Sequence, residues 1–302
     1  MVETTFTVHI PATTANLGPG FDCLGLALDL WNTVTFSLMD ALSPITIEGE
    51  GKGILPEDES NLVFQSANQL ANVHGRSLPQ NLHISCLNNI PIASGLGSSA
   101  GAIICGLVGA KNILNINISD HELLQTAAQI EGHADNAAAC LFGGLVLVRS
   151  ENDALHISHR EIQPVIAVIA VPGYSLSTKA ARKVLPKKVL LEDAVYNISH
   201  TVELMQVFQE GNYESLQETM SDKLHQVYRL PLLPGAEHAM LAALNAGAYG
   251  TSISGAGPSV IAFTNQKQAQ AVSDAMQSIY QQASISVRVF TLSCPVKGCF
   301  TT

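Results

Sequence analysis

The chain has 302 residues, of which 47% are hydrophobic and only 13% are charged. This length can bury a sizeable core without disulfides or a structural metal, and the composition excludes disorder over most of the chain. Asp and Glu number 25 against 15 Lys and Arg, so the formal net charge is −10. That balance argues against a non-specific nucleic-acid or anionic-membrane binder. Any anionic ligand must therefore be held locally, by backbone amides, a metal or a few arginines.

The N-terminus and the cysteines indicate a cytoplasmic protein. Residues 1–5 show no basic segment leading into an apolar one, so no signal peptide is expected. The longest apolar stretches, 101–110 and 165–171, are too short to span a bilayer. The cysteines form no CxxC pair and are expected to be buried thiols of a reducing compartment. They are Cys23, Cys86, Cys105, Cys140, Cys294 and Cys299.

Strand and helix patterns alternate along the whole chain, which predicts an α/β or α+β fold. The first strand is expected to stop at Pro11, and Ser119 with Glu122 forms an S-x-x-E capping box that starts a helix. In the first half, strands are predicted over 5–10, 31–38, 45–48, 82–87 and 145–148, and helices over 60–74, 98–114 and 119–130.

The polar segment 151–161 precedes a new buried strand, and it places the domain boundary between residues 160 and 161. The predicted domains are therefore 1–160 and 161–302. In the second half, strands are predicted over 165–171 and 284–292, helices over 191–210, 212–226, 236–246 and 266–281, and hairpin-like strands over 249–264.

The segment 91–101, Pro-Ile-Ala-Ser-Gly-Leu-Gly-Ser-Ser-Ala-Gly, joins a predicted strand to an apolar helix. Small residues let the backbone curl around a ligand, and a helix N-terminus offers unpaired N–H groups to an anion. Ser98 and Ser99 can add hydroxyl donors, or one of them can bind Mg²⁺. The segment predicts a phosphate-binding loop that needs no cationic side chain.

Two nucleotide-binding motifs fail on this segment, and one hydrolase motif fits. No Lys follows the glycines, as a Walker A loop requires, and Gly97 has no glycine three positions later, as a dinucleotide-binding motif requires. Residues 97–101 match G-x-S-x-G, which keeps a serine hydrolase with Ser99 as nucleophile open as an alternative. A glycine-rich helix start used only for close packing also remains open.

Two further small-residue motifs complete a family pattern. They are Pro-Ala-Thr-Thr-Ala-Asn-Leu-Gly-Pro-Gly-Phe-Asp at 11–22 and Ser-Ile-Ser-Gly-Ala-Gly-Pro-Ser at 252–259. With the segment 91–101, they resemble the three motifs of the GHMP kinase superfamily, and the first motif resembles the homoserine kinase branch. The resemblance implies a two-domain α+β fold, with an N-terminal nucleotide-binding α/β domain and a C-terminal ferredoxin-like α/β domain.

The activity that the resemblance implies is the ATP-dependent phosphorylation of the hydroxyl of L-homoserine to O-phospho-L-homoserine, in threonine biosynthesis. The alternatives are a GHMP kinase for another small hydroxyl substrate, the serine hydrolase, and an inactive nucleotide-binding protein. The resemblance also implies a homodimer.

ATP and Mg²⁺ are the implied cofactors. The family pattern assigns Glu131 and one of two serines, Ser98 or Ser99, to Mg²⁺, and Ser99 is the serine named here. It assigns Asn61 to the nucleotide, although an isolated Asn61 is more simply explained as a helix N-cap. Glu131 ends a predicted helix, where the helix dipole disfavours a carboxylate and favours a bound cation. The implied ATP-binding residues are Asn61, Pro91, Ile92, Ala93, Ser94, Gly95, Leu96, Gly97, Ser98, Ser99, Ala100 and Gly101.

Homoserine is a zwitterion with a hydroxyl, so its site needs a cation, an anion and a group that positions the hydroxyl. Arg182 and Arg229 can together hold one carboxylate through charge-assisted bonds, although each alone would be taken for a surface salt-bridge residue. The implied substrate-binding residues are Asn16, Asp22, His133, Thr178, Arg182, Arg229 and Gly257.

The implied catalytic residues are Asn136, Asp135 and Asp22. Asn136 would position the hydroxyl, and Asp135 is the alternative as a base. A base is not compulsory, because positioning and charge stabilisation can support a loose phosphoryl-transfer transition state.

Overall fold

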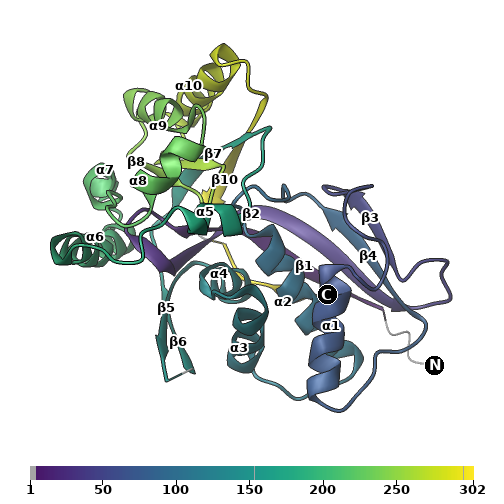
Figure 1. Ribbon diagram of the computed structural model, residues 1–302. Coiled ribbons are helices and arrows are strands. Elements are labelled where there is room, and N and C mark those ends of the chain that lie inside the picture. The colour runs from purple at the N-terminus through teal and green to yellow at the C-terminus, as the bar shows by residue number, and fades with distance from the viewer. Residues whose placement is uncertain (1–4, 153, 295) are drawn as a thin grey trace.

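The computed structural model describes residues 5–152, 154–294 and 296–302, which form two β-sheets with helices packed on them (Figure 1). Residues 1–4, which carry most of the argument about a signal peptide, lie outside the described residues. Among the helices that are described, none has the length and apolar character needed to cross a membrane. All six cysteines are free, and four of them are buried.

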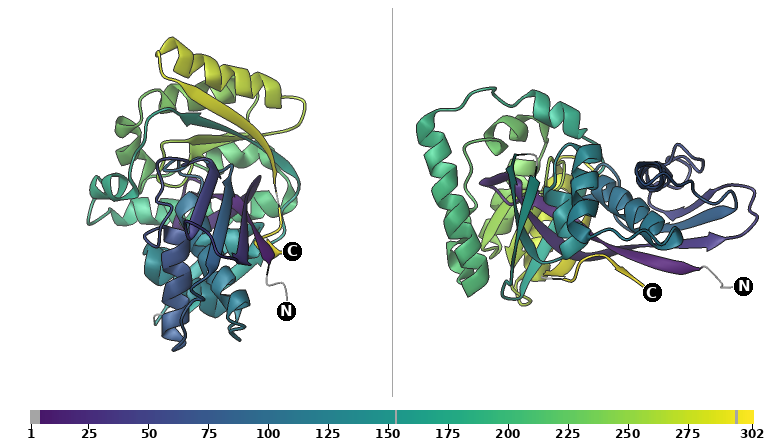
Figure 2. Two further views of the ribbon diagram at one scale, coloured as in Figure 1. Left: turned by 90° about the vertical axis from the view of Figure 1, so that its right-hand side faces the viewer. Right: turned by 90° about the horizontal axis from the view of Figure 1, so that it is seen from below.

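The first sheet contains seven strands of the described chain, in the order β11-β1-β2-β4-β3, with β5 pairing β2 and β6 pairing β5. Among these described strands, β3 and β4 pair in parallel and the other pairs are antiparallel. The strands are β1 (Phe6–Asn16), β2 (Gly20–Leu38), β3 (Ile45–Gly49), β4 (Leu82–Asn88), β5 (Leu145–Glu151), β6 (Ala154–Arg160) and β11 (Phe300–Thr301). The last strand, β11, lies beside the start of β1, so the chain ends on the sheet where it began (Figure 2).

Four helices cover this sheet: α1 (Leu62–Val73), α2 (Ser98–Ile113), α3 (Asp120–Glu131) and α4 (Asp135–Phe142). Helix α2 is apolar because it is buried between the sheet and the other helices. A Cβ at Gly109 would collide with the Phe36 ring, so a glycine is needed for this close approach. The predicted capping box at Ser119 and Glu122 is present and starts α3.

The second sheet has the order β10-β7-β9-β8 and is antiparallel throughout. Its strands are β7 (Val165–Pro172), β8 (Gly250–Ile253), β9 (Val260–Thr264) and β10 (Val287–Cys294). Helices α9 (Ala236–Asn245) and α10 (Ala269–Gln282) cover one face, which gives the β-α-β-β-α-β order of a ferredoxin-like domain. The two-part α+β architecture is therefore confirmed.

The side chains on the two faces of β7 belong to two different hydrophobic cores. Val168 and Ala170 face α9 and α10, whereas Ala167 and Ile169 pack with β2 and with helix α6 (Leu191–Glu210). The two sheets therefore share an apolar core, which fixes the two halves of the molecule against each other. The proposed boundary at 160/161 falls between β6 and β7.

The predicted helix 212–226 is wrong. This part of the chain forms a short 3-10 turn (Tyr213–Ser215), α7 (Leu216–Thr219), a non-helical segment and then α8 (Gln226–Arg229), which another 3-10 turn (Leu230–Leu232) follows. The carboxylate of Asp222 accepts hydrogen bonds from the backbone N–H groups of Leu224, His225 and Gln226. A new turn therefore starts after Asp222 instead of continuing α7.

Other boundaries also differ from prediction. Strand β1 does not stop at Pro11 but continues to Asn16, because a register shift against β2 at Pro11/Ala12 accommodates the proline. The polar segment 151–161 includes β6, which forms a hairpin with β5. Helices α4 and α5 (Thr178–Lys183) and strand β11 were not predicted.

Candidate active site

A cavity of about 420 Å³ is lined by residues from both halves of the chain. Most of the predicted site residues line it, although they come from six separate segments. They are Asn16, Asp22, Ile92, Ala93, Ser94, Gly95, Gly97, Ser98, Ser99, Glu131, His133, Asp135, Asn136, Thr178, Arg182, Arg229 and Gly257. Such a site between domains is a typical place for a small-molecule ligand.

Five predicted residues lie outside the lining: Asn61, Pro91, Leu96, Ala100 and Gly101. Asn61 is the N-cap of α1: its Oδ1 accepts from Val63 N at 2.9 Å, and its Nδ2 donates to Pro56 O at 2.7 Å. Its amide is therefore committed to the helix start. Leu55, Leu62 and Ala102, which the sequence did not single out, line the cavity and add apolar surface.

The three small-residue motifs are hydrogen-bonded to one another at the cavity. The bonds are Thr13 N to Leu96 O (3.1 Å), Gly255 N to Ala15 O (3.1 Å), Ser259 N to Ser94 O (3.1 Å) and Ser254 Oγ to Gly95 O (2.8 Å). Gly95 has φ +84°, and a Cβ there would collide with Ser254 O. Glycine is therefore required where the loop from the first half meets the β8–β9 turn of the second.

The start of α2 is open to an anion. Its N-cap is Gly97 at φ +71°, and no side chain caps the helix. The first N–H groups of the helix are left available, and the Ser98 and Ser99 residues line the cavity. This arrangement can bind phosphate groups through backbone amides and hydroxyls.

A hydroxyl and a carboxylate meet beside this helix start. Ser99 Oγ donates to Glu131 Oε2 at 2.8 Å, and Glu131 is the last residue of α3. The described residues contain no cluster of three or more His, Cys, Asp or Glu side chains arranged to hold a metal. Oxygen ligands in small number suit Mg²⁺, which usually keeps waters and binds substrate phosphates.

His133, Asp135 and Asn136 form a second polar group. The Nδ1 of His133 lies 2.8 Å from Asp135 Oδ1, which also accepts from Asn136 N at 2.7 Å. Burial lowers the pKa of His133, but the hydrogen bond and charge of Asp135, with the charge of Glu131, outweigh it and leave this pKa raised. Thr13 Oγ1 donates to Asn136 Oδ1 at 2.8 Å and holds that amide in place.

The guanidinium groups of Arg182 and Arg229 also line the cavity. Arg182 forms a bidentate ion pair with Asp22, at 2.8 and 2.7 Å. The guanidinium carbons of Arg182 and Arg229 lie 5.7 and 5.2 Å from the centre of the Phe21 ring. Burial and the charge of Arg182 lower the pKa of Arg229 to about 10, so it stays charged at neutral pH.

Asn16 connects these groups. Its Nδ2 donates to Gly255 O at 2.7 Å, and its Oδ1 accepts from Asp22 N at 3.0 Å. Asn16 therefore ties the first motif to the third and holds the backbone of Asp22.

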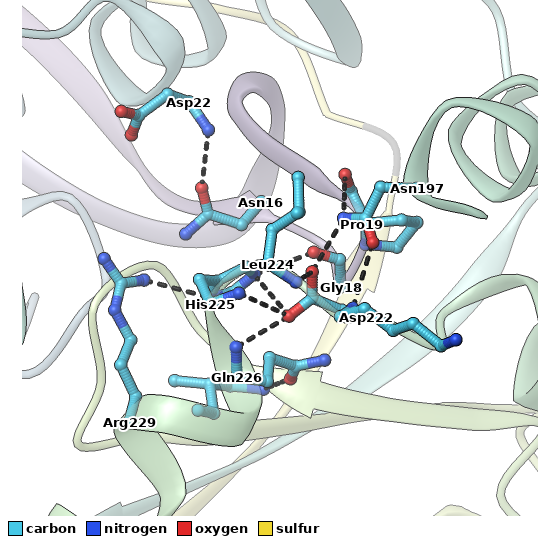
Figure 3. Close-up of polar contacts among 12 residues, drawn as sticks. Asn16, Gly18, Pro19, Asp22, Asn197, Asp222, Leu224, His225, Gln226 and Arg229 are labelled. Carbon is cyan, nitrogen blue, oxygen red and sulfur yellow. Dashed lines mark hydrogen bonds and ion pairs between the residues drawn. The ribbon is translucent and has the colours of Figure 1, made fainter. Parts of the chain in front are cut away.

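Sequence reasoning missed Asn197, Asp222 and His225, which form a buried polar cluster behind Arg229 (Figure 3). The only sequence signal was the i, i+4 spacing of His225 and Arg229.

Two family models and several related proteins match this chain, and they agree on its family. The family model for the GHMP kinases N terminal domain matches residues 61–144, and that for the GHMP kinases C terminal matches residues 204–282. The chain is 40% identical over 292 residues to the homoserine kinase of Desulfitobacterium hafniense, covering 96% of this chain and 98% of that protein. It is 41% identical over 288 residues to the homoserine kinase of Moorella thermoacetica, covering 95% and 96%.

Solved structures agree with these relatives. The homoserine kinase from Cytophaga hutchinsonii superposes with a TM-score of 0.88 at 32% identity, covering 100% of this chain and 98% of that one. The L. major mevalonate kinase shares the fold, with a TM-score of 0.70 at 13% identity, covering 99% and 97%. With the three motifs joined around one cavity and relatives matched over nearly their full length, the chain belongs to the homoserine kinase family of the GHMP kinases.

Proposed function

We propose that this chain transfers the γ-phosphoryl group of ATP to the hydroxyl of L-homoserine, giving O-phospho-L-homoserine in threonine biosynthesis. The observation that carries the proposal is the pairing, in one cavity, of an uncapped helix N-terminus with two arginines. The first suits a phosphate chain and the second suits an amino-acid carboxylate. Membership of the homoserine kinase family supports the same substrate.

ATP is proposed to lie along the loop 92–99 and the turn 255–257. The N–H groups at the start of α2 and the hydroxyls of Ser98 and Ser99 would bind its phosphates. Leu55 and Leu62 would contribute apolar surface to the nucleotide end of the cavity. The protein then holds a polyanion with little use of cationic side chains, which suits its net charge of −10.

Ser99 and Glu131 are proposed to hold Mg²⁺ through their oxygens. A bound Mg²⁺ would neutralise charge that develops on the phosphate oxygens. Glu131 stands at the C-terminal end of α3, where a nearby cation would relieve the unfavourable interaction with the helix dipole.

L-Homoserine is proposed to bind with its carboxylate toward Arg229 and Arg182 and its ammonium toward Asp22 and Asn16. Thr178 is the first residue of α5, which Ser177 caps, so its position is fixed by a helix start. Gly257, in the β8–β9 turn, would allow close approach of the ligand. Each charge of the zwitterion would then have an opposite charge at the site.

For the transfer step, the amino-acid hydroxyl oxygen would form a bond to the γ-phosphorus of ATP as the bond to the leaving ADP oxygen breaks. Asn136, held by Thr13, would orient the hydroxyl beside His133. The hydroxyl proton would pass to the transferred phosphate, or to Asp135 if that carboxylate acts as base. Orientation of the two reactants is a large part of the rate enhancement in such reactions.

The serine hydrolase alternative has less support. The Ser99 hydroxyl donates to the carboxylate of Glu131, whereas the nucleophile of a G-x-S-x-G hydrolase is activated by a histidine. Strand β4 ends at Asn88, so no strand leads directly into the turn before Ser99. A GHMP kinase for another small alcohol is also disfavoured, because relatives at about 40% identity over nearly the full length are homoserine kinases.

Product analysis tests the proposal. The purified protein is incubated with ATP, Mg²⁺ and L-homoserine and followed by phosphorus NMR. A new phosphate monoester coupled to the side-chain methylene of homoserine is expected, and inorganic phosphate alone would contradict transfer to the amino acid.

We further propose a cytoplasmic homodimer, as the family resemblance implies, and light scattering of the purified chain measures the oligomeric state.

A further inference from the structure

A buried polar cluster lies directly behind the candidate carboxylate site. It consists of Asn197, Asp222, His225 and Arg229, all of them at most 9% exposed, and we call it the Asp222 cluster (Figure 3). Burying so many polar groups is costly unless each finds a partner. The hydrogen-bond partners of each residue in the cluster therefore indicate which parts of the site the cluster positions.

Asp222 places the first turn of α8. Its carboxylate accepts from the N–H groups of Leu224, His225 and Gln226, at 2.9, 3.0 and 2.6 Å. Asn197, on α6, donates from Nδ2 to Asp222 Oδ1 at 2.7 Å and to Pro19 O at 3.0 Å. The backbone of His225 is thus tied to α6 and to the loop that joins β1 and β2.

The partners of His225 fix which of its ring nitrogens carries the proton. Nε2 lies 2.8 Å from the carbonyl oxygen of Gly18, which can only accept, so Nε2 is the donor. Nδ1 lies 3.1 Å from Nη1 of Arg229, which can only donate, so Nδ1 is the acceptor. Both bonds form only with the neutral Nε2–H ring. Burial lowers the pKa of His225, the positive charge of Arg229 lowers it further, and the opposing charge of Asp222 does not reverse the shift.

Arg229 is held through two of the three nitrogens of its guanidinium group. Its Nε donates to Ala181 O at 3.3 Å, and Nη1 donates to Gly255 O at 3.2 Å as well as to His225. Its other terminal nitrogen, Nη2, has no acceptor among the residues that the structure describes, and Arg229 lines the cavity. A guanidinium held in this way keeps the N–H groups of Nη2 as its remaining donors for a ligand.

We propose that His225 is a positioning residue for substrate binding: through Nδ1 it orients Arg229 so that the free Nη2 group of the guanidinium faces the substrate carboxylate. This inference rests on the proposed role of Arg229 in binding homoserine. The hydrogen bond from Nε2 to Gly18 O joins the orientation of Arg229 to the loop between β1, which ends at Asn16, and β2, which contains Asp22. His225 therefore couples the cationic and anionic ends of the amino-acid site.

Two variants of His225 separate its two hydrogen bonds. In His225→Gln, the side-chain amide reaches the position of Nε2 and keeps a donor for Gly18 but no acceptor for Arg229. In His225→Asn, the shorter side chain keeps an acceptor near Nδ1 and loses the bond to Gly18. We expect His225→Gln to raise the KM for homoserine about tenfold, since a hydrogen bond to a charged group is lost. We expect His225→Asn to raise it by less than about threefold, and both variants to leave the KM for ATP unchanged.

A double-mutant cycle tests whether His225 acts through Arg229. In an Arg229→Lys background, His225→Gln is expected to have less than about twofold further effect on the homoserine KM. Three outcomes would overturn the inference. The first is the same effect of His225→Gln on the homoserine KM in both backgrounds, and the second is a larger effect of His225→Asn than of His225→Gln. The third is an equal rise in the KM values for homoserine and ATP. If Arg229→Lys itself leaves the homoserine KM unchanged, the proposed role of Arg229 fails and the inference fails with it.

A measurement on the unaltered protein keeps the inference testable if His225→Gln does not fold. Nitrogen NMR of the histidine rings, with the signals of His225 assigned by their loss in His225→Asn, reports the tautomer. An unprotonated Nδ1 that shifts when homoserine is added is expected. A protonated Nδ1, or an Nδ1 signal that homoserine leaves unchanged, would overturn the inference even where the enzyme is active.

Discussion

Asp22 and Arg182, which are 160 positions apart in the chain, form a bidentate ion pair at the cavity, with N–O distances of 2.8 and 2.7 Å. The two side chains are about one-third exposed, so solvent screens the pair and it adds little to stability. A zwitterionic amino acid could bind to both partners at once, its carboxylate to the arginine and its ammonium to the aspartate. The pair therefore suits a ligand that carries both charges.

Replacing Asp22 with Asn tests this relationship. Asp22→Asn removes the anion proposed for the ammonium group, and we expect the homoserine KM to rise about tenfold or more while the KM for ATP stays unchanged. The pair of Glu50 and Arg288, which also joins the two halves of the chain, provides a matched control away from the cavity. Glu50→Gln should leave both KM values unchanged, and a similar effect of the two variants would remove Asp22 from the substrate site.

Replacing Glu131 with Gln tests the proposed magnesium site. The amide is nearly isosteric but uncharged, so we expect the Mg²⁺ concentration that gives half-maximal activity to rise about tenfold or more. Glu122, near the start of the same helix, provides the control, because a glutamine also serves in a capping box. Unchanged Mg²⁺ dependence in Glu131→Gln would mean that the metal is bound elsewhere.

Replacing Gly97 with Ala tests the helix start. Gly97 has φ +71°, and a Cβ there would collide with Thr13 Oγ1 and lie 3.3 Å from Asn136 Oδ1. We expect Gly97→Ala to lower kcat/KM for ATP strongly, because the loop must move away from the phosphates. Gly75→Ala is the control: Gly75 has φ +64° but open space around it, so this variant should lose about 1–2 kcal/mol of stability and keep normal kinetics. Equal kinetic losses in both variants would point to general destabilisation.

The buried His225 predicts a pH dependence of stability. Its pKa in the folded protein is lowered from the ordinary value of 6.5, chiefly by burial. The unfolded chain therefore binds the proton more readily, and the stability due to neutral His225 is fully present above about pH 6.5 and is lost as the pH falls toward the folded value. Urea unfolding between about pH 8 and pH 5 should show a smaller pH-dependent loss in His225→Gln than in the unaltered protein. An identical pH slope in both proteins would contradict a neutral buried ring.

The sequence predicted the parts of the site that lie within continuous motifs. The loop 91–101 and the motifs at 11–22 and 252–259 are rich in small residues for a local reason, since each must approach another backbone or a ligand closely. The long helix α6 was also predicted with its observed bounds, because its start, length and final glycine are all local signals.

The parts that were not predicted depend on contacts between distant residues. His225 bonds to Gly18, 207 positions away, and no local pattern identifies that partner. The helix predicted over 212–226 fails at Asp222, because a tertiary bond to Asn197 and local bonds from the N–H groups that follow Asp222 outweigh helix propensity there. Asn61 was assigned to the nucleotide by resemblance, whereas its residue type alone indicated the N-cap of α1 that the structure shows; the sequence could not show that it lies outside the cavity lining.

The most direct test of the central claim is acceptor-dependent ADP formation by the purified chain with ATP and Mg²⁺. L-Homoserine is compared with D-homoserine, L-serine, mevalonate, galactose and no acceptor. The charges of Arg182, Arg229 and Asp22 suit the carboxylate and the ammonium group of an amino acid. We therefore expect turnover with L-homoserine and none with mevalonate or galactose, which lack an ammonium group. Turnover with mevalonate or galactose but not with L-homoserine, or no turnover with any acceptor, would contradict it.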